Sequence, residues 1–132
     1  MDERKRLVIE GSRITGIPSF YDEINSVFMS GENWKLGESL DALDDLLHGG
    51  YGTVQGIGAV TLVWRDMAAS RSALGAETTR RFLEERQKLR PMFNGSAIAE
   101  QLEALAAGRG TTYFDIVMDI FAAHPAFTIV PA

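Results

Sequence analysis

Four side chains that can bind charged groups or metal ions crowd one short stretch of the chain. They are Asp41, Asp44, Asp45 and His48. At about 100° per residue, a helix places all four on one side. The carboxylates could hold a hard cation such as Mg²⁺, or they could present a negative surface to a positively charged partner.

Pair energies do not explain this cluster, because like charges three and four residues apart on a helix repel by a few tenths of a kcal/mol. The helix dipole stabilises acids near an N-terminus by about 0.3–1 kcal/mol, which suits Asp41 but not Asp44 and Asp45. A metal-dependent hydrolase would need ligands from other segments, and we expect His48 and His124, at loop edges, to make ordinary solvent contacts. We therefore predict no metal site, no cofactor and no catalytic residue, while the dipole and partner-binding interpretations stay open.

The residues around the cluster predict a short helix over 39–48. Ser39 is a suitable N-cap, because its hydroxyl can accept a hydrogen bond from a free amide of the first turn. Gly49 and Gly50 can supply the left-handed residue that ends a helix. Three leucines fall on the side opposite the acids, namely Leu40, Leu43 and Leu47. We expect the leucines to enter the core and the carboxylates to face solvent.

Length and charge restrict the class of protein. The 132 residues are 45% hydrophobic and include no cysteine, which predicts one folded domain, 1–132, in a reducing compartment. No segment has the length of a signal peptide or a membrane span, so we expect a cytoplasmic protein without membrane contacts. Residues 1–60 carry ten acids and five bases, whereas residues 61–132 carry eight of each. This distribution argues against nucleic acid and favours a basic protein as partner.

The hydrophobic pattern alternates strands with helices. Strands are predicted at 7–9, 59–64 and 127–130, and helices at 18–28, 39–48, 66–74, 77–90, 97–107 and 113–123. Such alternation predicts an α/β fold built on a three-stranded parallel sheet. The glycine-rich segment 48–58 leaves a helix and enters a strand, which is the reverse of a phosphate-binding loop.

Two segments carry more detailed expectations. In the helix at 18–28, Tyr21 and the pair Asp22-Glu23 are predicted to face solvent, where the helix dipole favours acids. The segment 75–110 is interpreted as a helical insertion at the surface, broken at residues 91–95. In its charged part only Phe82, Leu83 and Leu89 can be buried.

These segments resemble the barstar-like ribonuclease inhibitors. The specific part is Gly37-Glu38-Ser39-Leu40-Asp41-Ala42-Leu43 followed by Asp45, and the likeness extends to Leu7-Val8-Ile9-Glu10-Gly11, to Val63-Trp64-Arg65 and to the last helix and strand. The resemblance implies a three-stranded parallel sheet with helices packed on it. It also implies a ribonuclease inhibitor or bacterial toxin immunity protein, without enzymatic activity, whose acidic helix and preceding loop block a basic active site.

Carried over by position, the resemblance implies that Asp41 and Asp45 take the places of substrate phosphates and that Gly49 contacts the nuclease. The resemblance also implies a third contact acid on the helix before the last strand. Counting back from that strand gives Asp119, which we favour, and counting forward from the central strand gives Glu85. The predicted partner-binding residues are Trp34, Lys35, Leu36, Gly37, Asp41, Asp44, Asp45, His48, Gly49 and Asp119.

The chain also departs from the family pattern. Lys35 stands where the family has an aromatic contact residue, with Trp34 one place away. Asp44 and Gly50 replace tryptophans, and His48 replaces a small hydroxyl residue. A lysine at the rim of a site for a basic groove is unfavourable. An alternative function is therefore a barstar-fold binding or regulatory module for another basic protein, without ribonuclease inhibition.

Overall fold

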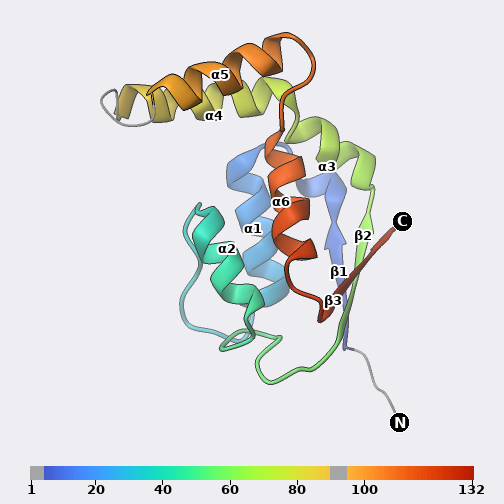
Figure 1. Ribbon diagram of the computed structural model, residues 1–132. Coiled ribbons are helices and arrows are strands. Elements are labelled where there is room, and N and C mark those ends of the chain that lie inside the picture. The colour runs from blue at the N-terminus through green and yellow to red at the C-terminus, as the bar shows by residue number, and fades with distance from the viewer. Residues whose placement is uncertain (1–4, 90–94) are drawn as a thin grey trace.

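A three-stranded parallel sheet organises the fold (Figure 1). The computed structural model describes residues 5–89 and 95–132. The strand order is β1-β2-β3, and both pairs are parallel. This confirms the predicted α/β class and sheet. In chain order the elements are β1 (Lys5–Glu10), η1 (Gly11–Arg13), α1 (Ile17–Phe28), α2 (Leu40–Leu47), β2 (Val60–Arg65), α3 (Met67–Ala73), α4 (Ala76–Leu89), α5 (Gly95–Ala106), α6 (Tyr113–Ala122) and β3 (Phe127–Pro131).

Helices α1, α2 and α6 gather on one face of the sheet (Figure 1). Because side chains alternate along a strand, Ile9 and Trp64, which are partners in the register, both point into this core and are fully buried. The other face carries a row of three valines in register, Val8, Val63 and Val130. Its outer members, Val8 and Val130, are 37% and 40% exposed. The core therefore lies between the sheet and one layer of helices.

A buried hydrogen-bond chain ties the central strand to α3. The Trp64 indole Nε1 donates to Ser70 Oγ at 2.9 Å, and Ser70 Oγ donates to the Gly11 carbonyl at 3.1 Å. A Cβ at Gly11 would lie 2.2 Å from the Arg65 carbonyl oxygen, so this close approach requires glycine. The chain satisfies the indole N–H, which must find a partner when it is buried.

The predicted solvent exposure of Tyr21 and Glu23 was wrong. Tyr21 is 2% exposed, and its hydroxyl lies 2.6 Å from that of Tyr113 on α6. Glu23 is 5% exposed, and its Oε2 accepts a hydrogen bond from the Glu10 amide at 2.9 Å. Both partners come from segments distant in sequence that cover this side of α1, so local periodicity could not reveal them.

Helices α4 and α5 pack together as a hairpin beyond the end of the sheet (Figure 1). Leu83, Ile98 and Leu105 form a small core of their own between the two helices. The predicted burial of Leu89 was wrong, since this side chain is 79% exposed. Of the predicted break at residues 91–95, residues 91–94 lie outside the described residues and Gly95 is the first residue of α5. The interpretation of 75–110 as an insertion stays a prediction.

The hairpin is joined to the main core at the start of α6. The Tyr113 amide donates to the buried Thr79 Oγ1 at 2.7 Å, and the Phe82 ring packs edge-on against the Tyr113 ring at 5.1 Å between centroids. α4, with 14 residues, is a surface helix. Within residues 5–89 and 95–132, no helix combines the length and apolar character that crossing a bilayer would need.

Candidate partner-binding site

Helix α2 holds the acidic cluster as predicted. Ser39 Oγ accepts a hydrogen bond from the Ala42 amide at 3.2 Å, which confirms the N-cap. Gly49 adopts φ 82°, the left-handed conformation that favours glycine at a helix end. Leu43 and Leu47 are buried in the core, as predicted, and Leu46 is buried beside them, whereas Leu40 is only partly buried. The helix is therefore fixed on its apolar side, and Asp41 and Asp45 are exposed on the other.

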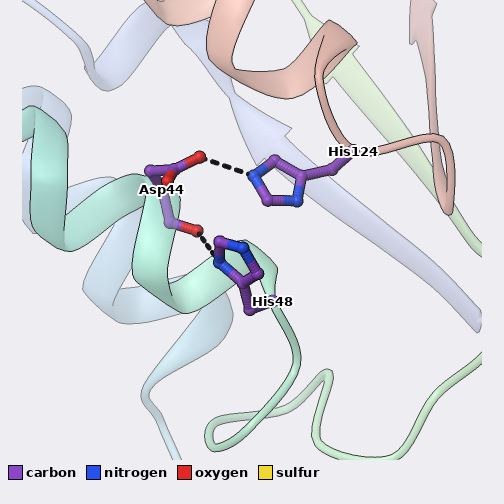
Figure 2. Close-up of side chains that lie close together, drawn as sticks. All are labelled: Asp44, His48 and His124. Atoms are coloured by element: carbon purple, nitrogen blue, oxygen red, sulfur yellow. Dashed lines mark hydrogen bonds and ion pairs between the residues drawn. The ribbon is translucent and has the colours of Figure 1, made fainter.

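Asp44 differs from its neighbours because it has a partner within the fold. Its Oδ1 accepts a hydrogen bond from His124 Nε2 at 2.7 Å, and its backbone carbonyl accepts one from His48 Nδ1 at 2.9 Å (Figure 2). The Asp44 side chain is 47% exposed and that of His124 only 12%. The expectation that His124 makes ordinary solvent contacts was therefore wrong, because the chain after α6 turns its imidazole toward α2. His48 is exposed, as expected.

The Asn25 side chain of α1 holds the end of the loop before α2. The Asn25 amide bonds the backbone of Leu36 twice: Leu36 N–H donates to Oδ1 at 2.8 Å, and Nδ2 donates to the Leu36 carbonyl at 3.2 Å. The Leu36 side chain is 7% exposed. Leu36 therefore positions the loop rather than offering a surface to a partner, whereas Lys35 and Gly37 beside it are exposed.

An aromatic pair lies between this loop and the segment after α2. The rings of Trp34 and Tyr51 are 4.9 Å apart between centroids, and Trp34 is 44% exposed. Partial burial and the nearby negative charge of Asp45 raise the pKa of Tyr51. The sequence analysis missed Tyr51. Its signal was an aromatic one residue beyond Gly50, a position where the family carries a tryptophan.

The glycine-rich segment after α2 is bonded back to α1 and to the loop. The Thr53 amide donates to the Phe28 carbonyl at 2.7 Å, and the Gly52 amide donates to Glu32 Oε2 at 2.9 Å. Gly52 has φ 79°, and a Cβ there would meet the Phe28 carbonyl at 2.6 Å. Glu32, also missed from sequence, therefore joins the two segments that flank α2, and the segment runs from helix to strand as predicted.

The two alternatives for a third acid lie on different helices. Asp119 is exposed on α6, which packs against α2. Glu85 is exposed on α4, where Lys88 Nζ lies 3.5 Å from its carboxylate. The structure thus brings α6, the helix of Asp119, beside the acidic helix α2.

A hollow lies at one end of α2, between the N-terminal part of this helix and α4. Its volume is about 300 Å³, and its lining residues are Glu38, Ser39, Leu40, Asp41, Phe82, Arg86 and Tyr113. Arg86 thus borders the hollow opposite two acids of the α2 segment. This cation was not anticipated from sequence, because nothing in the local pattern of α4 indicates which helix faces it.

A comparison with known protein families gives one match. The model of the family described as Barstar (barnase inhibitor) matches residues 4–100. This range contains β1, α1, the loop, α2 and β2, and it ends within α5. It includes Asp41, Asp45 and Glu85, whereas Asp119 lies beyond it. No curated protein matches the chain.

Proposed function

The chain belongs to the barstar family of barnase inhibitors, and from this premise we propose that it blocks the basic active site of a ribonuclease with α2 and the loop before it. One observation carries the proposal. Asp41 and Asp45 are exposed one turn apart on a helix whose opposite side is locked into the core, so their carboxylates need no reordering to meet a partner.

The carboxylates would act in place of RNA phosphates. A ribonuclease must bind phosphates with cationic side chains, and two fixed carboxylates on α2 offer those cations the same charge. Gly49 and His48 would contact the nuclease at the end of α2, and Gly37 at its start. Asp119 is proposed as the third acid, because α6 packs beside α2.

The aromatic pair supplies an apolar contact next to this charge. Trp34 is the more exposed member, and Tyr51 packs against it and has its pKa raised by burial and by the negative charge of Asp45. Tryptophan and tyrosine are enriched among the residues that contribute most to protein interfaces. We therefore add Tyr51 to the proposed contact surface beside Trp34.

Charge would also speed the encounter with the partner. All of the chain's excess negative charge lies in residues 1–60, and α2 presents part of it. Complementary charge raises association rates, and the complex of barnase with its inhibitor is among the examples from which this rule is drawn. Salt should slow association, because exposed charges are screened.

A second candidate function rests on Lys35 and Asp44. Lys35 is an exposed cation on the loop that would meet a basic groove, and Asp44 is engaged by His124 rather than fully available to a partner. These two residues favour a regulatory module that binds a different basic protein through the same helix. In this candidate function, the same surface around α2 binds a basic protein that is not a ribonuclease.

The experiment that tests the proposal is inhibition of purified barnase-type ribonucleases by the full chain. We expect loss of RNA cleavage at or below micromolar protein, and recovery of cleavage with the double variant Asp41→Ala/Asp45→Ala. The charge-matched control is Glu77→Ala/Glu84→Ala on α4, which should still inhibit. Full nuclease activity across the panel would reject the proposal. Affinity capture of another basic protein that depends on Asp41 and Asp45 would then support the regulatory module.

A further inference from the structure

The two histidines of the chain both contact Asp44, His124 at the carboxylate and His48 at the backbone carbonyl. Asp44 and His48 lie at the C-terminal half of α2, and His124 follows α6, 80 residues further along the chain (Figure 2). One possible ligand atom from each of the three lies within 4.8 Å of the others. Because the chain has only two histidines and no cysteine, this cluster holds both of its imidazoles, which are ligands that zinc and similar metals prefer.

Hydrogen bonds orient the imidazole rings of this cluster, as they commonly orient histidine ligands in metal sites. His48 Nδ1 donates to the Asp44 carbonyl at 2.9 Å, which fixes the tautomer and leaves Nε2 with a free lone pair. His124 Nε2 faces Asp44 Oδ1 at 2.7 Å. An ion bound between them would take the place of the proton on His124 Nε2, because a histidine ligand must be deprotonated at the ligating nitrogen. The neutral ring would then carry its proton on Nδ1.

The spacing requires small movements only. Tetrahedral zinc at about 2.0–2.1 Å from each ligand sets the ligand atoms roughly 3.3 Å apart. The Asp44–His124 pair would have to open slightly from 2.7 Å, and His48 would have to approach from within 4.8 Å. His48 is exposed, so its ring can turn without disturbing the core.

A structural tether accounts for only part of the cluster. The bond from His124 to Asp44 joins the segment after α6 to α2 and needs one histidine. The second imidazole lies edge-on to the first, with centroids 4.8 Å apart and planes at 86°, and its hydrogen bond goes to the Asp44 backbone carbonyl rather than to the carboxylate that bonds His124. Two imidazoles and one carboxylate, open to solvent on one side, match the three-ligand sites of zinc that keep a fourth position free.

We propose that Asp44, His48 and His124 form a binding site for one divalent transition-metal ion of the zinc class. The ion would sit on the outward side of α2, joined to the segment that follows α6. It would cover the charge of Asp44 while leaving Asp41 and Asp45 negative.

Zinc titration of the full chain, purified without a histidine tag, tests this site. Calorimetry should show one Zn²⁺ per chain, and the two imidazole signals in NMR spectra should both shift with that stoichiometry. Mg²⁺, which prefers oxygen ligands, should produce neither effect at the same concentrations. Absence of saturable zinc binding, or tighter binding of Mg²⁺, would overturn the proposal.

Matched variants place the ion. Asp44→Asn, His48→Gln and His124→Gln should each weaken zinc binding at least tenfold, because even residues that only orient metal ligands are worth about 10–100-fold. Asp45→Asn, the same change one residue along the helix, should alter it less than twofold. If His124→Gln unfolds the protein, His48→Gln decides, since this exposed side chain bonds only within its own helix. Unchanged binding in His48→Gln and Asp44→Asn would overturn the site. The measurement uses the protein alone, so its outcome is independent of any ribonuclease.

Discussion

Helices α2 and α4 both turn acidic side chains to solvent, but only α4 supplies cations to its own acids. On α4, Arg80 pairs with Glu77 and with Glu84, and Arg81 also reaches Glu77 at 3.3 Å. On α2, Asp41 and Asp45 have no ion pair with the cations of residues 5–89 and 95–132. Both helices therefore carry several exposed acids, but those of α4 are paired with cations of the same helix and Asp41 and Asp45 of α2 are not.

The difference separates acids that stabilise a surface helix from acids that are available to a partner. The cations of α4 lower the pKa of Glu77, chiefly through its hydrogen bond to Arg80, so its carboxylate is already satisfied. α2 has no basic residue in its last turn and gains nothing comparable from its own sequence. Unpaired like charges on one helix face repel each other. A partner with cations at matching positions would replace this repulsion with attraction between the acids and its cations.

The largest expected effect comes from removing one unpaired acid. If α2 enters a nuclease, Asp45→Ala leaves a cation of the partner buried without a counter-charge, which costs about 3–5 kcal/mol. The inhibition constant should then rise roughly 150- to 5000-fold, as measured by titrating the inhibitor against RNA cleavage. Glu84→Ala on α4 is the control and should leave the constant within about twofold. Equal losses in the two variants would show that α2 is not distinguished from α4.

The next effect concerns the inward sides of the same two regions. Leu46 of α2 is fully buried in the main core, whereas Leu83 of α4 belongs to the small core of the hairpin. Leu46→Ala should lower the free energy of unfolding by about 2–5 kcal/mol in urea titrations. Leu83→Ala should act more locally and accelerate amide hydrogen exchange in α5 before global unfolding. A uniform loss of protection in Leu83→Ala would show instead that hairpin and core unfold together.

Alkaline pH should weaken the core beneath both helices. Burial raises the pKa of Tyr21 and the pKa of Tyr113, and their mutual hydrogen bond raises that of Tyr21 further. An unfolded tyrosine loses its proton near pH 10, while the folded protein keeps it to higher pH. This contribution is therefore complete below pH 10, and above it stability falls by about 1.4 kcal/mol per pH unit for each such tyrosine.

Urea titrations between pH 9 and pH 11 check this slope. The double variant Tyr21→Phe/Tyr113→Phe should lose the tyrosine part of the decline, whatever its stability at neutral pH. Tyr51→Phe, at a half-buried ring, should retain most of it. An identical decline in all three proteins would assign the effect to other groups.

Local signals in the sequence predicted the elements well. The predicted Ser39 cap is present at the start of α2, and Leu43 and Leu47 of the predicted leucine stripe are buried. A cap of the same local kind opens α6, where Thr112 and Asp115 exchange hydrogen bonds of 3.0 and 3.1 Å. These interactions join residues three or four apart, so sequence spacing carries the information. The same holds for the exposure of Asp41 and Asp45.

Contacts between distant segments were outside the reach of such patterns. Glu23 is buried because Glu10, in another element, donates to it, and His124 meets Asp44 across 80 residues. Each of these side chains is polar, and the sequence therefore indicated solvent. The packing of α6 beside α2 places His124, which follows α6, against Asp44 of α2, and this contact can be seen only in the folded structure.

The smallest effect is expected from a change that removes the cation shared by two acids of α4. Arg80→Ala leaves Glu84 without its arginine and Glu77 paired with Arg81 alone, so the outward face of α4 becomes more like that of α2. Because exposed ion pairs contribute little to stability, the urea midpoint should hardly move. The variant should also inhibit as the parent does, because α4 lacks the fixed loop and the aromatic pair that accompany the acids of α2. The triple variant Asp41→Ala/Asp45→Ala/Arg80→Ala then tests whether α4 can bind the basic partner in place of α2. If this variant still captures the partner, exposed acids on a helix are sufficient for binding. Loss of capture in this variant would show that the partner requires the whole surface around α2.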